Sequence, residues 1–345
     1  MRFLAVPVLA AAISFLWACG GQESSSLHPE NELASSEPRV LAVYMGAQAA
    51  NETTVAPWEP TEIEAFVQRV GTSPHAIMWY QNWAESDRNN FNPKDANGRG
   101  VMDEVVSRGA MPIVTWEPWD TTKGTEQPDY ELKDIIDGKY DDYITQWAQD
   151  AAAWGKPMYL RFAHEMNGHS YPWSIGLNGS TSVDYVAAWK HIHDIFVSNG
   201  ATNVRWIWSP LIACRGCTEF SKVYPGDDYV DWVALDGYNW GTEQNAGIWQ
   251  TMGQIFGRSY DEVTALAPDK PFMIAETASA EVGGNKANWI TNAFYEDIPT
   301  RLPKTKAIIW FDADKERDWR VNSSDASLEA YKKVAKDPSY QGWLP

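Results

Sequence analysis

Two glutamates are the residues of this sequence best suited to act together on a substrate. Glu165 lies in the segment YLRFAHEMNG (159–168), and Glu276 lies in the segment PFMIAET (271–277). Each glutamate comes at the end of a short apolar run that is expected to form a β-strand. Two facing carboxyl groups are the machinery of glycoside hydrolysis, in which one donates a proton and the other acts as nucleophile or base. The fold must therefore bring the ends of two distant strands together.

Short apolar runs rich in β-branched and aromatic residues recur eight times, and segments of helical periodicity separate most of them. The expected strands are 40–45, 76–80, 112–116, 158–163, 204–209, 232–237, 272–276 and 307–311. The expected helices are 61–70, 102–107, 140–154, 183–198, 249–266, 287–295 and 327–335, with a short one at 220–223. This alternation predicts an α/β fold, a (β/α)₈ TIM barrel in one catalytic domain. The C-terminal ends of its strands meet at one face, which places Glu165 and Glu276 across a pocket.

The composition favours a folded domain that acts on a neutral substrate. Hydrophobic residues make up 44% of the 345 residues, which is enough for a sizeable core. The chain has 28 Lys and Arg residues against 46 Asp and Glu residues, a formal net charge of −18. Such a charge repels polyanions, so we expect no nucleic-acid partner.

The N-terminal residues predict export and a lipid anchor. Residues 1–18 contain a short apolar run typical of a signal peptide, and LWACG (16–20) resembles the lipobox of bacterial lipoproteins. Cys19 would then carry the lipid, and residues 19–38 would be a polar linker to a catalytic domain at 39–345. We expect the protein at the bacterial cell envelope, held to the membrane surface by this anchor alone. The alternative is an ordinary signal peptide cleaved nearby, with Cys19 left as a free thiol.

The remaining cysteines, Cys214 and Cys217, lie in the segment ACRGCT (213–218). One such pair cannot complete a four-ligand zinc site, and no histidine lies near it in the sequence. In an exported protein the pair favours a local disulfide that stiffens the loop after the fifth strand. We expect no metal site.

Polar side chains are crowded at the end of the fourth expected strand, where Arg161, His164, Glu165 and Asn167 occur within seven residues. Burying these groups is costly unless they serve one another or a ligand. The alternative is that Glu165 is a structural residue and that His164 is a core histidine with satisfied hydrogen bonds. Aromatic residues favour the ligand, because sugar rings stack on aromatic faces while their hydroxyls form hydrogen bonds. Tryptophans recur at the expected strand ends, at positions 79, 83, 116, 119, 208, 240 and 310.

Several motifs in chain order resemble those of glycoside hydrolase family 26. They are RFAHEMNG (161–168) with YPW (171–173), WIWSP (206–210), ALDGYN (234–239), MIAE (273–276) and IWF (309–311). The resemblance implies a retaining enzyme in which Glu165 is the acid/base and Glu276 the nucleophile. It also implies that His164 lies beside the acid/base, that Tyr238 hydrogen-bonds the nucleophile, and that Trp310 floors the central sugar subsite. Substrate contacts are expected from His164, Asn167, Tyr171, Trp173, Tyr238, Trp240, Trp310 and Trp116. The reaction requires no cofactor.

The resemblance leaves several substrates open. The family contains β-1,4-mannanases, mixed-linkage β-1,3-1,4-glucanases and β-1,3-xylanases. Many of its mannanases follow the acid/base motif with a tryptophan-rich run, whereas this chain has HSYPW (169–173). The difference favours mixed-linkage glucan over mannan, with β-1,3-xylan as a further alternative. A surface lipoprotein that binds glycan without cleaving it is an alternative of another class, although such a protein would need neither glutamate.

Overall fold

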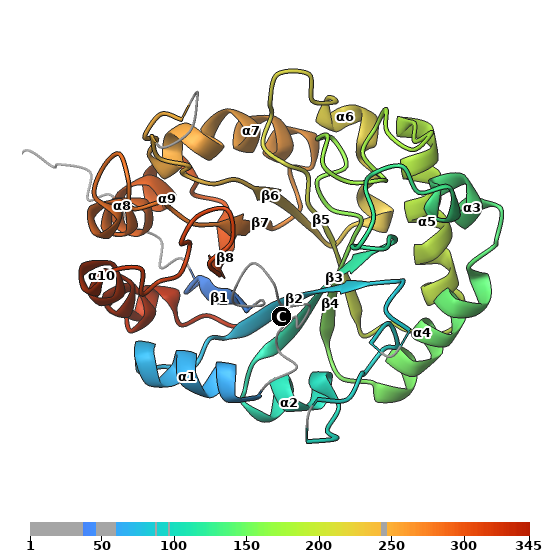
Figure 1. Cartoon of the computed structure of the whole chain (residues 1–345), viewed down its shortest axis with the longest axis horizontal. Helices are drawn as coiled ribbons and strands as arrows, with labels where there is room; N and C mark the ends of the chain where they lie inside the picture. The colour runs from blue at the N-terminus through green and yellow to red at the C-terminus, as the bar shows by residue number, and fades with distance from the viewer. Residues whose placement is uncertain (1–36, 46–59, 87, 96, 243–246) are drawn as a thin grey trace, which may run out of the picture. The chain divides into compact units, whose positions relative to one another are not determined.

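Eight parallel strands close into a barrel in which each strand pairs with its neighbours in chain order, and β8 pairs with β1 (Figure 1). The computed structural model describes residues 37–45, 60–86, 88–95, 97–242 and 247–345. The strands are β1 Val40–Met45, β2 Ala76–Asn82, β3 Met111–Glu117, β4 Met158–Phe162, β5 Val204–Trp208, β6 Trp232–Asp236, β7 Phe272–Thr277 and β8 Thr305–Asp312. The predicted (β/α)₈ barrel is confirmed.

Helices surround the strands on the outside of the barrel (Figure 1). They are α1 Pro60–Val70, α2 Val101–Ser107, α3 Leu132–Ile136, α4 Asp141–Trp154, α5 Ser182–Ser198, α6 Phe220–Val223, α7 Met252–Leu266, α8 Lys286–Asn292, α9 Ile298–Arg301 and α10 Asp325–Ala335. The sequence did not predict α3 or α9. The helix expected at 287–295 is α8 followed by a π-helical turn, Ala293–Asp297.

Two N-terminal predictions lie beyond the part of the chain that the structure describes. The signal peptide, Cys19 and the linker up to residue 36 all precede the first described residue. Among the described residues, no helix is both long enough and apolar enough to cross a membrane.

Side chains alternate along each strand between the barrel interior and the layer under the helices. In β3 and β4, Thr115 and Arg161 point inward and contact each other. Their neighbours Trp116 and Phe162 point outward and pack among aromatic side chains of α4 and α5, namely Trp147, Trp189 and Phe196. The largest aromatic residues therefore build the core between strands and helices, and polar residues occupy the barrel axis.

Strand β7 carries one extra residue close to its C-terminal end. Ile274 pairs with Leu235 of β6, but the next pair is Glu276 with Asp236, so that Ala275 has no partner in the ladder. The pairing with β8 shifts at the same place. A bulge changes the direction of the side chains that follow it. Here it brings Glu276, at the end of β7, to face the barrel axis.

A buried lysine of α8 fixes the loop between β8 and α10. Lys286 has no exposed surface, and its Nζ donates to the carbonyls of Asp318 and Arg320 at 3.0 and 2.8 Å and to Ser323 Oγ at 2.8 Å. Burial lowers the pKa of Lys286 to about 8. The loop, residues 313–324, also receives a hydrogen bond at the Trp319 carbonyl from the indole of Trp310. The hydrogen bonds of Lys286 thus hold the loop against the barrel wall.

Replacing this lysine should destabilise the protein. Lys286→Met keeps most of the side-chain volume but leaves three buried acceptors without a donor, so we expect a loss of about 1–3 kcal/mol in the free energy of unfolding. Urea denaturation measures it. Lys133→Met, at a side chain that is 71% exposed, is the control and should change stability by less than about 0.5 kcal/mol. Equal stabilities of the two variants would show that Lys286 does not support the loop.

Candidate active site

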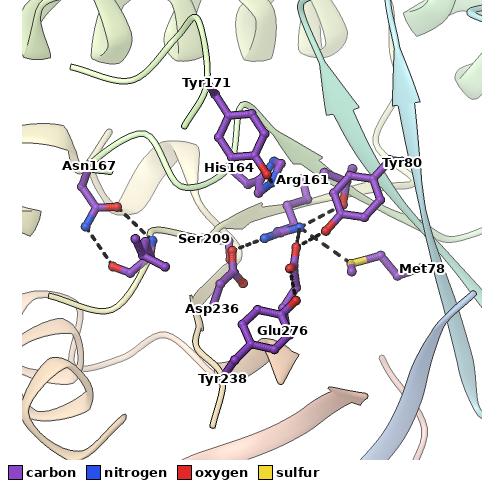
Figure 2. Close-up of polar contacts among 12 residues, drawn as sticks. Met78, Tyr80, Arg161, His164, Asn167, Tyr171, Ser209, Asp236, Tyr238 and Glu276 are labelled. Carbon is purple, nitrogen blue, oxygen red and sulfur yellow. Dashed lines mark hydrogen bonds and ion pairs between the residues drawn. The ribbon is translucent and has the colours of Figure 1, made fainter. Parts of the chain in front are cut away.

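The centre of the site is an arginine that joins two carboxylates inside the barrel. Arg161 on β4 has no exposed surface, and it forms ion pairs with Asp236 at the end of β6 and with Glu276 at the end of β7 (Figure 2). Its Nη1 lies 2.7 Å from Glu276 Oε1 and 3.1 Å from Thr115 Oγ1. Ser209 donates to the second oxygen of Asp236 at 2.9 Å. The guanidinium therefore fixes the position of Glu276 from inside the barrel.

Two tyrosines hold Glu276 from the sides. Tyr80 of β2 donates to Oε1, and Tyr238 donates to Oε2 at 2.5 Å (Figure 2). Tyr238 therefore makes the contact with Glu276 that the resemblance implied. With Arg161, three side chains donate hydrogen bonds to this carboxyl group, which suits an ionised carboxylate.

Glu165 reaches the site from an irregular turn after β4. The expected strand 158–163 ends at Phe162, because Ala163 and Glu165 adopt positive φ angles of 43° and 51°. Such angles are unusual for residues other than glycine and are found at functional sites. The Glu165 N–H donates to the Ser209 carbonyl at 2.8 Å, which ties the turn to the end of β5. Burial, together with the negative charge of Glu276, raises the pKa of Glu165 to about 8.

The two glutamates face each other across an open pocket. One oxygen each of Glu165, Asp236 and Glu276 lie within 4.8 Å of one another. The pocket has a volume of about 650 Å³ and receives side chains from several loops above the strands. Its aromatic lining consists of Tyr44, Tyr80, Trp119, Tyr171, Tyr238, Trp240, Phe311 and Trp319. A concave site with opposed carboxyl groups and many aromatic rings suits a carbohydrate.

Of the expected substrate contacts, Tyr171, Tyr238 and Trp240 line the pocket, and His164 lies behind it. His164 Nε2 is 3.0 Å from the Tyr171 hydroxyl (Figure 2). Burial and then the charge of Arg161 lower the pKa of His164 well below its usual value, so the ring is neutral. Trp173 is also fully buried, stacks on Tyr171 at 4.6 Å between ring centroids, and donates to the His164 carbonyl. His164 and Trp173 therefore support Tyr171 from behind, at the wall of the pocket.

Besides Trp173, two further expected tryptophans lie outside the pocket, which corrects the sequence interpretation. Trp116 packs under the helices with Trp147, as described above, and Trp310 packs against Trp289 of α8 and Tyr331 of α10. Both have no exposed surface. The reason is strand alternation: the next residue in each strand, Glu117 and Phe311 respectively, faces the pocket instead.

Asn167 serves the backbone rather than the pocket. Its amide group accepts from the Leu211 N–H at 2.9 Å and donates to the Leu211 carbonyl at 2.8 Å (Figure 2). The loop after β5, to which Leu211 belongs, contains a disulfide between Cys214 and Cys217. These contacts join the turn that carries Glu165 to the loop after β5.

Several pocket residues were not predicted. Tyr80, Glu117, Lys315 and Trp319 all line the pocket, and Asp236 lies beneath it in the ion pair with Arg161. Glu117 and Tyr80 lie in the last residues of β3 and β2, so their place at strand ends was a usable signal. Lys315 and Trp319 belong to the loop 313–324, which has no comparable signal in its residue pattern.

Two clusters have the residue types of a metal site, but their bonding argues against that use. Glu165, Asp236 and Glu276 lie close enough to share an ion, yet Arg161 already pairs with two of them. His169 lies near Cys214 and Cys217, whose sulfur atoms are consumed in the disulfide.

Comparisons with known proteins agree with this geometry. The model of glycosyl hydrolase family 26 matches residues 104–311. Endoglucanase H of Acetivibrio thermocellus is 42% identical over 284 residues, which is 80% of this chain and 29% of that protein. Beta-1,3-xylanase TXYA of a Vibrio species is 28% identical over 126 residues, 34% of this chain and 26% of that protein. The chain spans less than a third of the length of these curated relatives.

Solved structures share the fold. The catalytic domain of a GH26 endo-beta-1,4-mannanase from Bacillus sp. JAMB-750 superimposes with a TM-score of 0.64 at 19% identity, covering 88% of this chain and 87% of that one. A GH26 beta-mannanase from Bacteroides ovatus gives a TM-score of 0.59 at 16% identity, covering 89% of this chain and 91% of the other. The family model covers more than half of the chain, and the chain therefore belongs to glycosyl hydrolase family 26.

Proposed function

We propose that this protein is a retaining endo-β-glycanase that cleaves a neutral β-linked polysaccharide, with Glu276 as nucleophile and Glu165 as acid/base. The single observation that supports this most is the pair itself, whose nearest oxygens lie within 4.8 Å of each other across an open pocket. Retaining enzymes place the two carboxyl groups about 5–5.5 Å apart, whereas inverting enzymes leave about 6.5–9.5 Å for a water molecule.

The environments of the two glutamates fit opposite roles. Glu276 accepts hydrogen bonds from Arg161, Tyr80 and Tyr238, so its carboxylate is oriented for attack on the anomeric carbon. Glu165, with a pKa of about 8, carries the proton that the leaving oxygen needs at neutral pH. Because the acid must be protonated, activity should fall as the pH rises through about 8.

The same electrostatics explain how Glu165 changes role. In the first step, the C–O bond to the leaving sugar breaks, Glu165 protonates that oxygen, and Glu276 forms an ester with the anomeric carbon. The ester removes the negative charge that helped to raise the pKa of Glu165. Glu165 then ionises more easily and can take a proton from the water that hydrolyses the ester.

Among the neutral glycans, we favour mixed-linkage β-1,3-1,4-glucan. The segment HSYPW (169–173) differs from the tryptophan-rich run of many mannanases in this family. The 42%-identical relative is named an endoglucanase. Mannan and β-1,3-xylan are the alternatives. One relative is named a β-1,3-xylanase and another a mannan endo-1,4-β-mannosidase, and each is 28% identical over a shorter part of this chain.

A reducing-sugar assay on lichenan, galactomannan, xylan and β-1,3-xylan tests the substrate. We expect the highest kcat/KM on lichenan. The double variant Glu165→Ala, Glu276→Ala is the control for contaminating activity and should release no sugar. A higher kcat/KM on galactomannan would assign the enzyme to mannan, and wild-type protein that binds these glycans without cleaving any would make it a binding protein.

Separate variants test the two roles. Glu165→Ala should nearly stop polysaccharide hydrolysis but spare the first step for an aryl glycoside whose phenolate leaves unaided, giving a burst and an ester on Glu276 that mass spectrometry detects. Glu276→Ala should show no burst, and added azide should restore cleavage of the aryl glycoside with inverted product. Equal loss of all activities in both variants, with no trapped ester, would contradict these assignments.

We also propose that the protein is exported and held at the envelope by lipid on Cys19, an inference that rests on the sequence of residues 1–38. In a bacterial host, Cys19→Ser should move the protein from the membrane fraction to the soluble fraction, because the lipid on Cys19 would be its attachment to the membrane and the variant would lack it. Cys214→Ser is the matched control and should stay with the membrane. Wild-type protein with an unmodified N-terminus in the soluble fraction would refute the anchor.

A further inference from the structure

Glu117 is a buried carboxyl group of the pocket that the proposed reaction does not use. It is the last residue of β3, its side chain points into the pocket, and only 4% of the residue is exposed. A carboxyl group at this depth costs free energy unless it is paired or serves a ligand.

Most other buried acids in the described part of the chain have cationic partners, whereas Asp95 accepts hydrogen bonds from backbone N–H groups. Asp236 and Glu276 share Arg161, and Glu104 pairs with two arginines. Within that part of the chain, no lysine or arginine forms an ion pair with Glu117. Its nearest basic nitrogen is Nδ1 of the neutral His164, at 3.9 Å from Glu117 Oε1.

Burial leaves Glu117 protonated at neutral pH. Burial raises its pKa to about 8 and the charge of Glu276 adds to this effect, while Trp119, Lys315 and Arg161 act in the opposite direction. The phenols of Tyr44 and Tyr171 also face it and are themselves neutral, because burial raises their pKa. A protonated carboxyl group can both donate and accept a hydrogen bond.

The indole of Trp119 lies beside Glu117 in the same wall. Trp119 lines the pocket two residues after Glu117, and its buried N–H approaches the Glu117 carboxyl group closely enough to lower the pKa of Glu117, although it does not reach full hydrogen-bond geometry. Buried N–H groups nearly always have a partner, so this indole positions the carboxyl group. A sugar hydroxyl in the pocket can then exchange a hydrogen bond with the protonated carboxyl group.

We propose that Glu117, positioned by the indole of Trp119, binds one hydroxyl of the substrate glycan, away from the reacting bond, and helps to select the sugar. This inference rests on the proposed glycanase function. Glu117 stands at the end of β3, whereas the reacting pair comes from the segments that end β4 and β7, so its contact is with the sugar and not with the breaking bond.

The test compares Glu117→Ala with Glu117→Gln on the best glycan of the panel. Glu117→Ala should lower kcat/KM by about 10- to 100-fold, mainly through KM, because it leaves a substrate hydroxyl and the Trp119 indole without their partner. Glutamine keeps a donor and an acceptor and should recover most of this loss. Trp119→Phe should also raise KM.

The pH profile separates binding from a structural role. In the wild type, KM should rise above about pH 8, where Glu117 loses its proton and with it the donor. The Glu117→Gln variant should lack this rise, while kcat still falls with the ionisation of Glu165. Glu262→Ala, an exposed residue of α7, is the control for substitution at a distance.

Three outcomes would overturn the proposal. One is a Glu117→Ala variant with wild-type KM, and another is a Glu117→Gln variant as impaired as Glu117→Ala. The third is a loss of kcat/KM that comes with a matching loss of thermal stability, which would make Glu117 a structural residue. If the wild type itself cleaves no glycan, the proposed function fails instead, which is a different result.

Discussion

The site depends on the buried ion pairs of Arg161. One guanidinium lies between the carboxyl groups of Asp236 and Glu276, with no exposed surface on the arginine. Burial, and then the negative charge of Glu276, favour the protonated form of Glu165. In the proposed reaction, the ester on Glu276 would remove that charge. The position of Glu276, which Arg161 holds, therefore contributes to both protonation states that the proposed retaining reaction requires of Glu165. A lysine would not replace Arg161, because two separate carboxylates need the fork of a guanidinium.

Backbone irregularities complete the placement of the pair. The extra residue in β7 directs Glu276 inward, and the positive φ angles at Ala163 and Glu165 make the turn after β4. Each such non-glycine angle costs about 1–3 kcal/mol in backbone strain. Two contacts with the segment after β5 stabilise that turn: Asn167 hydrogen-bonds the backbone of Leu211, and the Glu165 N–H donates to the Ser209 carbonyl. The rigid loop after β5, closed by its disulfide, thus helps to hold the acid/base in place.

How far the sequence predicts this structure depends on the kind of signal. Strands of a parallel barrel are apolar throughout, so their number, order and approximate ends could be read directly, as could the two glutamates beyond them. The same continuous apolarity hides which face each residue takes. Trp116 and Trp310 were assigned to the pocket, Trp310 from the family resemblance, although their neighbours Glu117 and Phe311 face it. Because side chains alternate along a strand, an error of one residue assigns a core side chain to the pocket and a pocket side chain to the core. The bulge in β7 and the unusual backbone after β4 leave no trace in periodicity.

Strands and loops contribute different parts of this pocket. Arg161, Asp236 and Glu276 belong to the strands, where the closed sheet fixes every backbone position. Trp240, Lys315 and Trp319 come from the segments that follow β6 and β8, and Trp319 packs edge to face on Trp240 with ring centroids 5.1 Å apart. Loops tolerate change in sequence far better than strands do, so one barrel can keep its reaction while its pocket walls are altered for another glycan. In this chain the hydrogen bonds of Lys286 to Asp318, Arg320 and Ser323 anchor the β8 loop, so a change in this pocket wall would also have to keep these contacts.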